Sequence, residues 1–266
     1  MIHPDNLAHP DLDRPVAEDY PAPALVYAGE VEAGLHFRSH SHRWAQLFHI
    51  VSGSVTVETA RGSFVVPPER ALWIPPDVPH AVTYLQRSAL RYLFLRPEAA
   101  RHLPPEPSVI RLSPLLRELV LALLGHPRDA AAVGGPAGRI VGVILDQLVA
   151  EPIAPLHLPM PEAARLRRAV AELAADPARA DGLAEVAARA ALSERSFERH
   201  FRAETGLSFR AWRRQARLLK AVEWLSLGAS VGDVSDRLGY EGPSAFVAGF
   251  RKAFGVTPGR YFAEGG

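Results

Sequence analysis

The chain has 266 residues, with 30 Lys plus Arg, 29 Asp plus Glu, 24 Pro and no Cys. This length favours two domains that each bury a core. The lack of cysteine excludes a disulfide-stapled secreted module and any thiolate chemistry. No apolar run approaches the roughly 18 residues of a membrane helix. Residues 1–15 lack a basic region followed by an apolar one, so we expect a cytoplasmic protein with no membrane partner.

The net charge of +1 conceals an asymmetry. Through Glu151 there are 13 Arg and 16 acidic residues, whereas the remainder has 17 Lys plus Arg and 13 acidic residues. Eight basic residues lie between Arg195 and Lys220, against Glu198 and Glu204 alone. Such a run is often only a solvated helix face, but it also favours a nucleic-acid partner.

Residues 24–95 predict short strands. Val55 and Val57 alternate with polar neighbours, and the run at residues 64–66 stops at two prolines. Many short strands separated by Gly and Pro are typical of a β-sandwich or small barrel. The preceding residues, 1–23, contain five prolines and form either an arm over this domain or a disordered tail.

Two helices are expected next. Ser113 followed by Pro114 is an N-terminal capping pattern, and leucines at helical spacing follow it. A second helix is predicted at about 136–150. Both are apolar around most of their circumference, so they pack on the barrel, form a dimer interface, or do both. The sensor domain thus spans 24–151, and a Pro-rich linker follows at 152–161.

The remaining sequence predicts helices only, in a domain at 162–262. Two helix-turn-helix patterns, at about 183–204 and 231–254, flank a long basic helix at about 209–227. Phe197 and Phe201 anchor the second helix of the first unit, which leaves Arg195, Glu198, Arg199 and Arg202 on its open face. Arg can bond a guanine edge and Glu can accept from cytosine. Two such units in tandem favour a DNA-binding domain over ordinary helix packing.

This domain resembles the AraC/XylS family of transcription regulators. The resemblance rests on residues 217–221, 238–240, 244–246 and 250–258, the last of which read FRKAFGVTP. In that family each reading helix enters a major groove. The resemblance implies base-facing Arg195, Glu198 and Arg199 in the first unit, Ser244, Ala245 and Ala248 in the second, and phosphate contacts from Arg251 and Lys252. Ser193, Ser196 and Arg202 complete the predicted DNA-binding set.

The second predicted reading helix offers almost no hydrogen-bonding side chain. We therefore expect the first unit to carry most base discrimination, and the second to contribute methyl contacts, phosphate contacts and shape.

The N-terminal half resembles the cupin motifs. Gly34, His40, His42, Gln46 and Gly53 match the first motif, with Gln46 where cupin enzymes usually have Glu. His80 matches the second, with Asp77 in place of the usual Gly. The fold class we predict is therefore α+β with two domains. A cupin-like β-barrel or jelly roll with dimerisation helices precedes an all-α double helix-turn-helix domain.

Three histidines are candidate ligands of a divalent metal. His40 and His42 lie two apart on a predicted strand, so both point to the same side, and His80 joins them if that side is the barrel interior. Gln46 is a poor neutral fourth ligand, which weakens binding of a cation. The alternative is a metal-free effector pocket formed by His40, His42, Trp44, Gln46, Trp73 and His80. Either Trp can equally be plain core.

The sequence therefore predicts a ligand-responsive transcription regulator, a homodimer that binds promoter DNA and an unidentified small molecule, and not an enzyme. The subgroup with the HxHxWxQL stretch (residues 40–47) often controls a nearby efflux transporter gene, which the resemblance implies here. The alternative is a metal-dependent cupin oxygenase or isomerase fused to a DNA-binding module. A third possibility is a scaffold that does not bind DNA.

Overall fold

The computed structural model describes residues 22–127, 135–148 and 156–263. The predicted arm at 1–23 and the first part of the predicted linker lie almost wholly outside these residues. The described residues of Met1–Val57 and Val66–Ala154 form one compact unit, and those of Glu58–Val65 and Pro155–Gly266 form a second. Within the described residues, none of the helices has the length and apolar character needed to cross a membrane.

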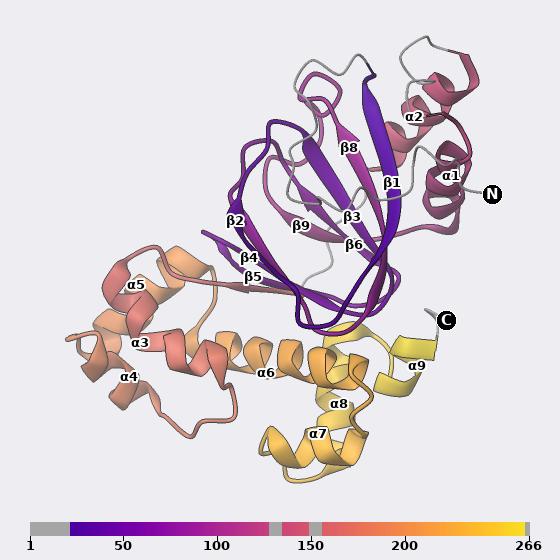
Figure 1. The fold of residues 1–266 in the computed structure, drawn as a ribbon. Coiled ribbons are helices and arrows are strands. Elements are labelled where there is room, and N and C mark those ends of the chain that lie inside the picture. Colours follow the sequence, from indigo (N-terminus) through magenta and orange to yellow (C-terminus); the bar gives the residue numbers. More distant parts are fainter. Residues whose placement is uncertain (1–21, 128–134, 149–155, 264–266) are drawn as a thin grey trace. The chain divides into compact units, whose positions relative to one another are not determined.

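Two five-stranded sheets are present (Figure 1). The first has the order β1-β8-β3-β6-β9 and is antiparallel at each junction. It is built from β1 (Ala24–Val31), β8 (Ser88–Leu95), β3 (Ala45–Ser52), β6 (Arg70–Ile74) and β9 (Ser108–Arg111). The second has the order β10-β5-β4-β7-β2. It is built from β10 (His157–Pro159), β5 (Gly62–Val66), β4 (Val55–Thr59), β7 (His80–Tyr84) and β2 (His36–His40).

Strand β3 shows how the sheet separates its two faces. Successive side chains of a strand point to opposite sides. Leu47 therefore packs in the apolar cluster that includes Trp73 and Leu93, whereas Gln46 and Phe48 line an internal cavity. The register places Phe48 opposite Tyr92, and their rings stack at 5.0 Å.

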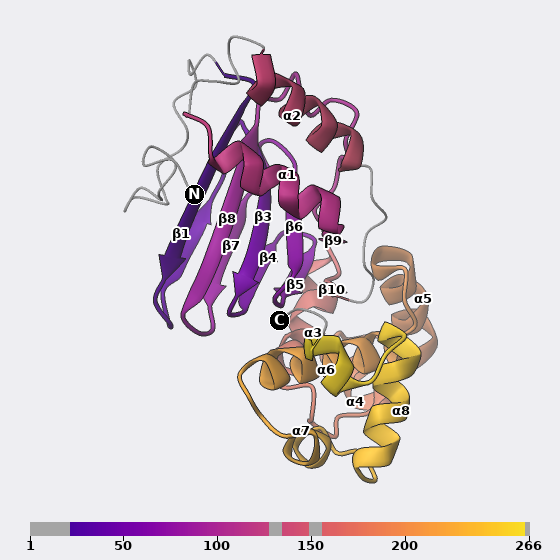
Figure 2. The same cartoon turned by 90° about the vertical axis from the view of Figure 1, so that its right-hand side faces the viewer.

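Helices α1 (Pro114–Leu124) and α2 (Gly135–Gln147) cover the outer face of the first sheet, as Figure 2 shows. Ser113 caps α1, since its hydroxyl accepts a hydrogen bond from the Leu116 N–H at 3.1 Å. Val120, Val141 and Ile144 are buried in the same cluster as the sheet residues. The prediction that these helices pack on the barrel is confirmed.

Strand β10 lies within residues 152–161, which were expected to form a linker followed only by helices. That expectation was wrong at this strand. His157 pairs with Phe64, and their rings stack at 4.3 Å. The indole N–H of Trp212 donates to the Pro159 carbonyl at 2.7 Å. Pro159 is tolerated because β10 is an edge strand, where a missing N–H breaks no ladder on the open side.

The helical unit contains the predicted tandem motif. Its helices are α3 (Ala164–Ala175), α4 (Leu183–Arg189), α5 (Glu194–Thr205), α6 (Phe209–Ser226), α7 (Val231–Arg237), α8 (Pro243–Phe254) and α9 (Pro258–Ala263). Ser193, Ser208 and Ser230 cap α5, α6 and α7 through their hydroxyls. Helices α3 and α9 are additions to the elements that the sequence predicted.

Candidate functional sites

Helix α5 is held in a fixed orientation by its aromatic side. Phe197 and Phe201 are fully buried and stack at 5.3 Å, and Phe201 also contacts Trp212 of α6 edge-to-face at 5.7 Å. At 3.6 residues per turn, burying these two positions commits the opposite side of the helix to solvent.

Three arginines occupy that open side of α5. Arg195, Arg199 and Arg202 are all exposed, and the Arg199 guanidinium lies 3.2 Å from Nε2 of His200. Ser193, at the start of the helix, accepts a hydrogen bond from the Ser196 N–H at 3.3 Å. Each arginine offers a fork of donors suited to a base edge or a phosphate.

Glu198 has a partner inside the domain. Both of its carboxylate oxygens lie 3.3 Å from the backbone N of Phe209, which begins α6. This is a favourable place for a carboxylate, because the first N–H groups of a helix lack intrahelical acceptors and carry partial positive charge. The Glu198 carboxylate, which the sequence analysis assigned to cytosine, therefore has a hydrogen-bond partner within the domain.

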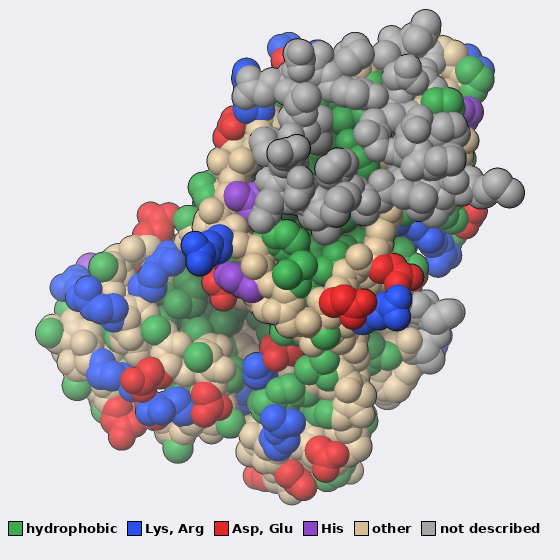
Figure 3. Space-filling view, viewed as in Figure 1, with side chains coloured by type: hydrophobic (Ala, Val, Ile, Leu, Met, Phe, Trp, Pro, Cys, Tyr) green, Lys and Arg blue, Asp and Glu red, His purple; other side chains and the backbone are tan. Residues whose placement is uncertain are grey.

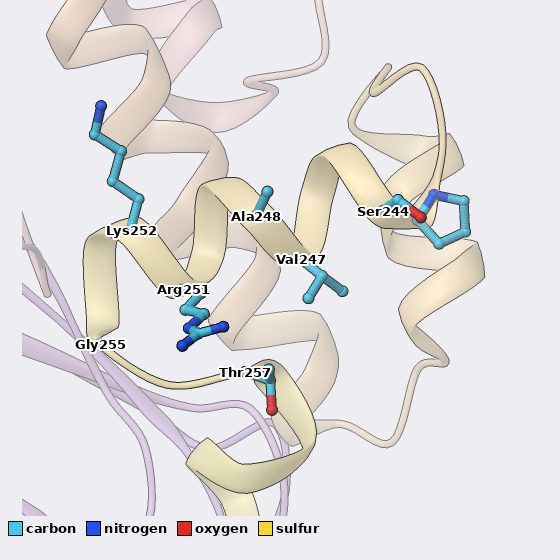
Figure 4. A pocket seen from close by; sticks show the side chains of 8 residues that line it. Ser244, Val247, Ala248, Arg251, Lys252, Gly255 and Thr257 are labelled. Atoms are coloured by element: carbon cyan, nitrogen blue, oxygen red, sulfur yellow. The ribbon is translucent and has the colours of Figure 1, made fainter.

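Helix α8 presents a different surface. Ser244, Ala245 and Ala248 are exposed, as are Arg251 and Lys252. An open hollow of about 750 Å³ lies along it, between the helix and the segment carrying Thr257. Figure 4 shows Val247 and Arg251 on the side toward Thr257, whereas Ala248 and Lys252 point to the opposite side. Its cations are thus confined to the C-terminal end of the helix.

Three other basic side chains of the helical unit, Arg179, Arg189 and Lys220, are engaged in ion pairs. Arg189 pairs with Asp181 at 2.7 Å and Arg179 with Glu172 at 3.1 Å. Over this unit, the face seen in Figure 3 accordingly shows Lys and Arg interspersed with Asp and Glu. By contrast, neither Arg195 nor Arg202 has an ion pair with any described residue.

The sandwich encloses a small cavity of about 20 Å³. Aromatic and aliphatic side chains fill most of the space, and the Tyr84 and Tyr92 hydroxyls are hydrogen-bonded at 2.8 Å. The cavity is lined by Phe37, His40, Gln46, Phe48, Ile74, His80, Val82, Tyr84 and Tyr92. The six of these that the sequence analysis missed could have been found from strand alternation, since Phe48, Val82, Tyr84 and Tyr92 all lie on the inward-facing register.

The structure brings His40, His42 and His80 together, although by a different route from the predicted one. Of the two histidines predicted to share a strand, only His40 lies on one, because β2 ends at that residue and His42 lies in the following loop. His80 is the first residue of β7. The loop carbonyl of His42 accepts a hydrogen bond from the Asp77 N–H at 2.9 Å. Asp77 has φ +61°, a left-handed conformation that explains why the cupin motif usually has Gly there.

The two tryptophans are buried and do not line this cavity. Trp73 faces the outer side of the sheet, in the cluster covered by α1 and α2, and its indole N–H donates to the Pro104 carbonyl at 2.8 Å. Trp44 packs with Ala22 and Leu25. Trp73 falls on the opposite side of its strand from the inward-facing Ile74. Their positions agree with the alternative that either tryptophan is plain core.

Burial favours the neutral form of two of the clustered histidines, His42 and His80. Burial lowers the pKa of His80 to about 4 and also lowers the pKa of His42. Gln46 Oε1 lies 3.2 Å from Nε2 of His42. The cavity lining contains no carboxylate, so the site is polar at one corner and otherwise apolar.

These features define a class of protein: a DNA-binding regulator that combines a tandem helix-turn-helix unit with a ligand-binding β-sandwich. Residues 186–264 match the family described as helix-turn-helix domain, and residues 23–136 match the AraC-like ligand binding domain.

Relatives agree. The chain is 36% identical over 264 residues to the HTH-type transcriptional regulator NimR of Escherichia coli, covering 99% of this chain and 94% of that protein. It is 33% identical to RipA of Corynebacterium diphtheriae over 107 residues, 40% of this chain and 31% of that one. A structure of ToxT from Vibrio cholerae is similar at a TM-score of 0.38 and 10% identity, over 91% of this chain and 98% of that one. The chain belongs to the AraC family of transcriptional regulators.

Proposed function

We propose that this regulator recognises a specific promoter sequence mainly through α5. The support is the contrast between its two reading helices. Helix α5 exposes Arg195, Arg199 and Arg202, whereas the first two turns of α8 expose Ser244, Ala245 and Ala248. Bidentate Arg contacts are the commonest source of base discrimination in the major groove.

Helix α8 then contributes more to affinity for DNA than to discrimination between base sequences. Arg251 and Lys252 lie at its C-terminal end and suit phosphate oxygens. The small side chains of Ser244, Ala245 and Ala248 allow close approach and contact with thymine methyl groups. The role of Ser193 and Ser196 is to begin α5 in the correct position, with their hydroxyls near the phosphates.

The effector acts through the sandwich. A cavity of about 20 Å³ is close to the space needed by a single water. An organic effector therefore binds by displacing side chains, with polar contacts from His40, His42, Gln46 and His80. Because a packed interior resists gradual deformation, such displacement favours a second arrangement of the surrounding elements.

The chain functions as a homodimer in this proposal, with α1 and α2 as the contact surface. Leu115 is 51% exposed and Val143 41% exposed on these helices, and Leu119 and Ile140 are partly buried beside them. Leu115→Glu and Val143→Glu are expected to lower the molar mass measured by light scattering from dimer to monomer. An unchanged mass in both variants contradicts this interface.

The protein acts without catalytic turnover in this proposal. The observation that favours this over an oxygenase or isomerase is the neutral Gln46 at the place of the usual acid, in a cavity with no carboxylate in its lining. Oxygen consumption and isomerisation assays with candidate substrates test it, and turnover that depends on His80 contradicts it.

The decisive experiment is to sequence genomic fragments retained by the purified protein. It yields the operator, and the adjacent genes show whether a transporter gene lies beside it. Binding to the operator is then compared for the parent, Arg199→Ala and Arg168→Ala, which removes an exposed arginine from α3. We expect only Arg199→Ala to lose specificity, by about 1 to 3 kcal/mol. Equal effects of the two variants contradict reading by α5.

A further inference from the structure

The three histidines at the cavity corner form a cluster with ligand spacing. One ring nitrogen from each of His40, His42 and His80 lies within 4.8 Å of the others. The ring centroids are 4.3 Å apart for His40 and His80, 5.2 Å for His42 and His80, and 6.2 Å for His40 and His42.

Each of these rings has its Nδ1 atom fixed by a backbone carbonyl. Nδ1 of His40 lies 2.9 Å from the Arg38 oxygen, Nδ1 of His42 2.5 Å from the Trp44 oxygen, and Nδ1 of His80 2.9 Å from the Val78 oxygen. A carbonyl can only accept, so Nδ1 carries the hydrogen in all three rings. The neutral tautomer then leaves the lone pair on Nε2. This is the arrangement that orients histidines which ligate metals.

Gln46 adds a fourth oxygen donor. Its Oε1 atom lies 3.2 Å from Nε2 of His42. If Nδ1 of His42 carries the hydrogen, two lone pairs face each other at this distance. A cation bound to both atoms removes that repulsion, whereas in its absence the amide must turn to present its NH₂ group.

The positions of the rings are set by the backbone. His40 and His80 are direct partners in the β2–β7 register. The loop that carries His42 is tied to the turn before His80 by the hydrogen bond from Asp77 N–H to the His42 carbonyl, at 2.9 Å. The cluster is therefore held by main-chain contacts before any ligand arrives.

We propose that His40, His42 and His80 bind one divalent transition-metal ion inside the sandwich, with Gln46 as a weak fourth ligand. This goes beyond the proposed function, which requires no metal. Three imidazoles and an amide oxygen suit Zn²⁺, Co²⁺, Ni²⁺ or Cu²⁺, and they do not suit Mg²⁺ or Ca²⁺, which prefer oxygen ligands.

The available space agrees with an ion more than with an organic molecule. The cavity of about 20 Å³ accepts an ion and little else without displacing side chains. Tetrahedral zinc with Zn–N bonds near 2.1 Å places its ligand nitrogens about 3.4 Å apart. The ligand nitrogens lie within 4.8 Å of one another, so binding an ion draws them closer together.

The test uses the untagged full chain, freed of metal with a chelator. Titration with CoCl₂ is followed by visible absorption, and titration with ZnCl₂ by calorimetry. We expect one ion per chain. His40→Gln and His80→Gln should each weaken binding by about tenfold or more. The matched control is His36→Gln, because His36 is on the same strand but its ring bonds Thr83 outside the cluster.

Circular dichroism establishes that each variant is folded. If His80→Gln does not fold, His40→Gln carries the test, because His40 is only partly buried. The proposal is overturned if the parent binds no stoichiometric ion, or if a folded cluster variant binds as tightly as His36→Gln does. Operator binding is measured on the same metal-free sample. If the parent binds no ion but still binds the operator, this metal proposal fails and the proposed regulator function stands.

Discussion

The carboxylate of Glu198 accepts a hydrogen bond from the backbone N–H of Phe209 and so joins α5, the helix proposed to read bases, to the first turn of α6. A side chain on the outer surface of a reading helix is thereby used to fix the helix that connects the two helix-turn-helix units. The sequence analysis expected Glu198 to face a base, whereas this contact gives its carboxylate a partner within the domain.

Glu198→Ala is expected to destabilise the protein by about 1 kcal/mol, because the Phe209 N–H loses its charged acceptor at a helix N-terminus. Thermal unfolding measures this. Glu198→Gln, which keeps an oxygen acceptor, should lose less. Base preference, measured with operators mutated one position at a time, should stay the same. A changed preference at one position with unchanged stability would show that Glu198 reads a base.

Arg251→Ala should weaken binding to operator and to unrelated DNA by a similar factor. Arg251 lies at the end of α8 beside the hollow in Figure 4, where phosphate contact is expected. The slope of log affinity against log salt should fall by about one. Ser244→Ala should change operator affinity by less than about 0.5 kcal/mol. Loss of specific binding in Ser244→Ala would move base reading to α8.

Ala191 and Gly239 hold equivalent turns in the two units, with φ of +52° and +69°. A Cβ at Gly239 would meet no atom within 4 Å, so the conformation alone decides the effect. Gly239→Ala should destabilise by about 1 kcal/mol, because non-glycine residues are strained in this region. Ala191→Gly should stabilise by about 0.5 kcal/mol, since relief of strain outweighs the added flexibility of the unfolded chain. Thermal unfolding measures both effects. A Gly239→Ala variant more stable than the parent, or an Ala191→Gly variant less stable than the parent, would contradict this prediction.

The buried His49 should make the free energy of unfolding depend on pH. It is 1% exposed, neither ring nitrogen has a hydrogen-bond partner in the described residues, and burial lowers its pKa to about 3. The unfolded chain takes up a proton near pH 6.5 while the folded chain does not. Stability contributed by the neutral ring is thus complete above pH 6.5 and is lost as pH falls toward 3, by up to about 1.4 kcal/mol per pH unit.

His49→Leu removes this contribution and should flatten the dependence of unfolding free energy on pH by one proton between pH 6.5 and 3. It also replaces unpaired buried nitrogens with an apolar group, so stability at pH 7 should not fall by more than about 1 kcal/mol. Urea unfolding at several pH values measures both quantities. An unaltered slope in the variant would mean that His49 is protonated, or solvated, in the folded protein.

The helical unit was largely predictable from sequence because its signals are local. Ser193, Ser208 and Ser230 cap helices, and phenylalanines at helical spacing identify the buried sides. Strand β10 was missed because three residues that end in Pro159 show no alternation. Its formation depends on pairing with β5, which is distant in sequence.

The cavity was predictable only in part. The motif spacing identified His40, His42 and His80 as a cluster, and the structure assembles them. The motif spacing could not show that β2 ends at His40. The pairing of β2 with β7 is irregular between Phe37 and His40, and such an irregularity leaves no mark in the motif. Nor could composition separate Trp73 in the core from Tyr92 in the cavity. That distinction depends on which side of a strand each residue occupies.

In the proposed mode of recognition, the difference between α5 and α8 gives the DNA site a direction along the duplex. One chain is expected to require a well-defined block of bases where α5 lies and to tolerate variation where α8 lies. Reversing a half-site in place should therefore abolish recognition even though its base composition is unchanged. A promoter recognised in this way carries orientation as well as position, and neighbouring transcription signals can be arranged relative to it.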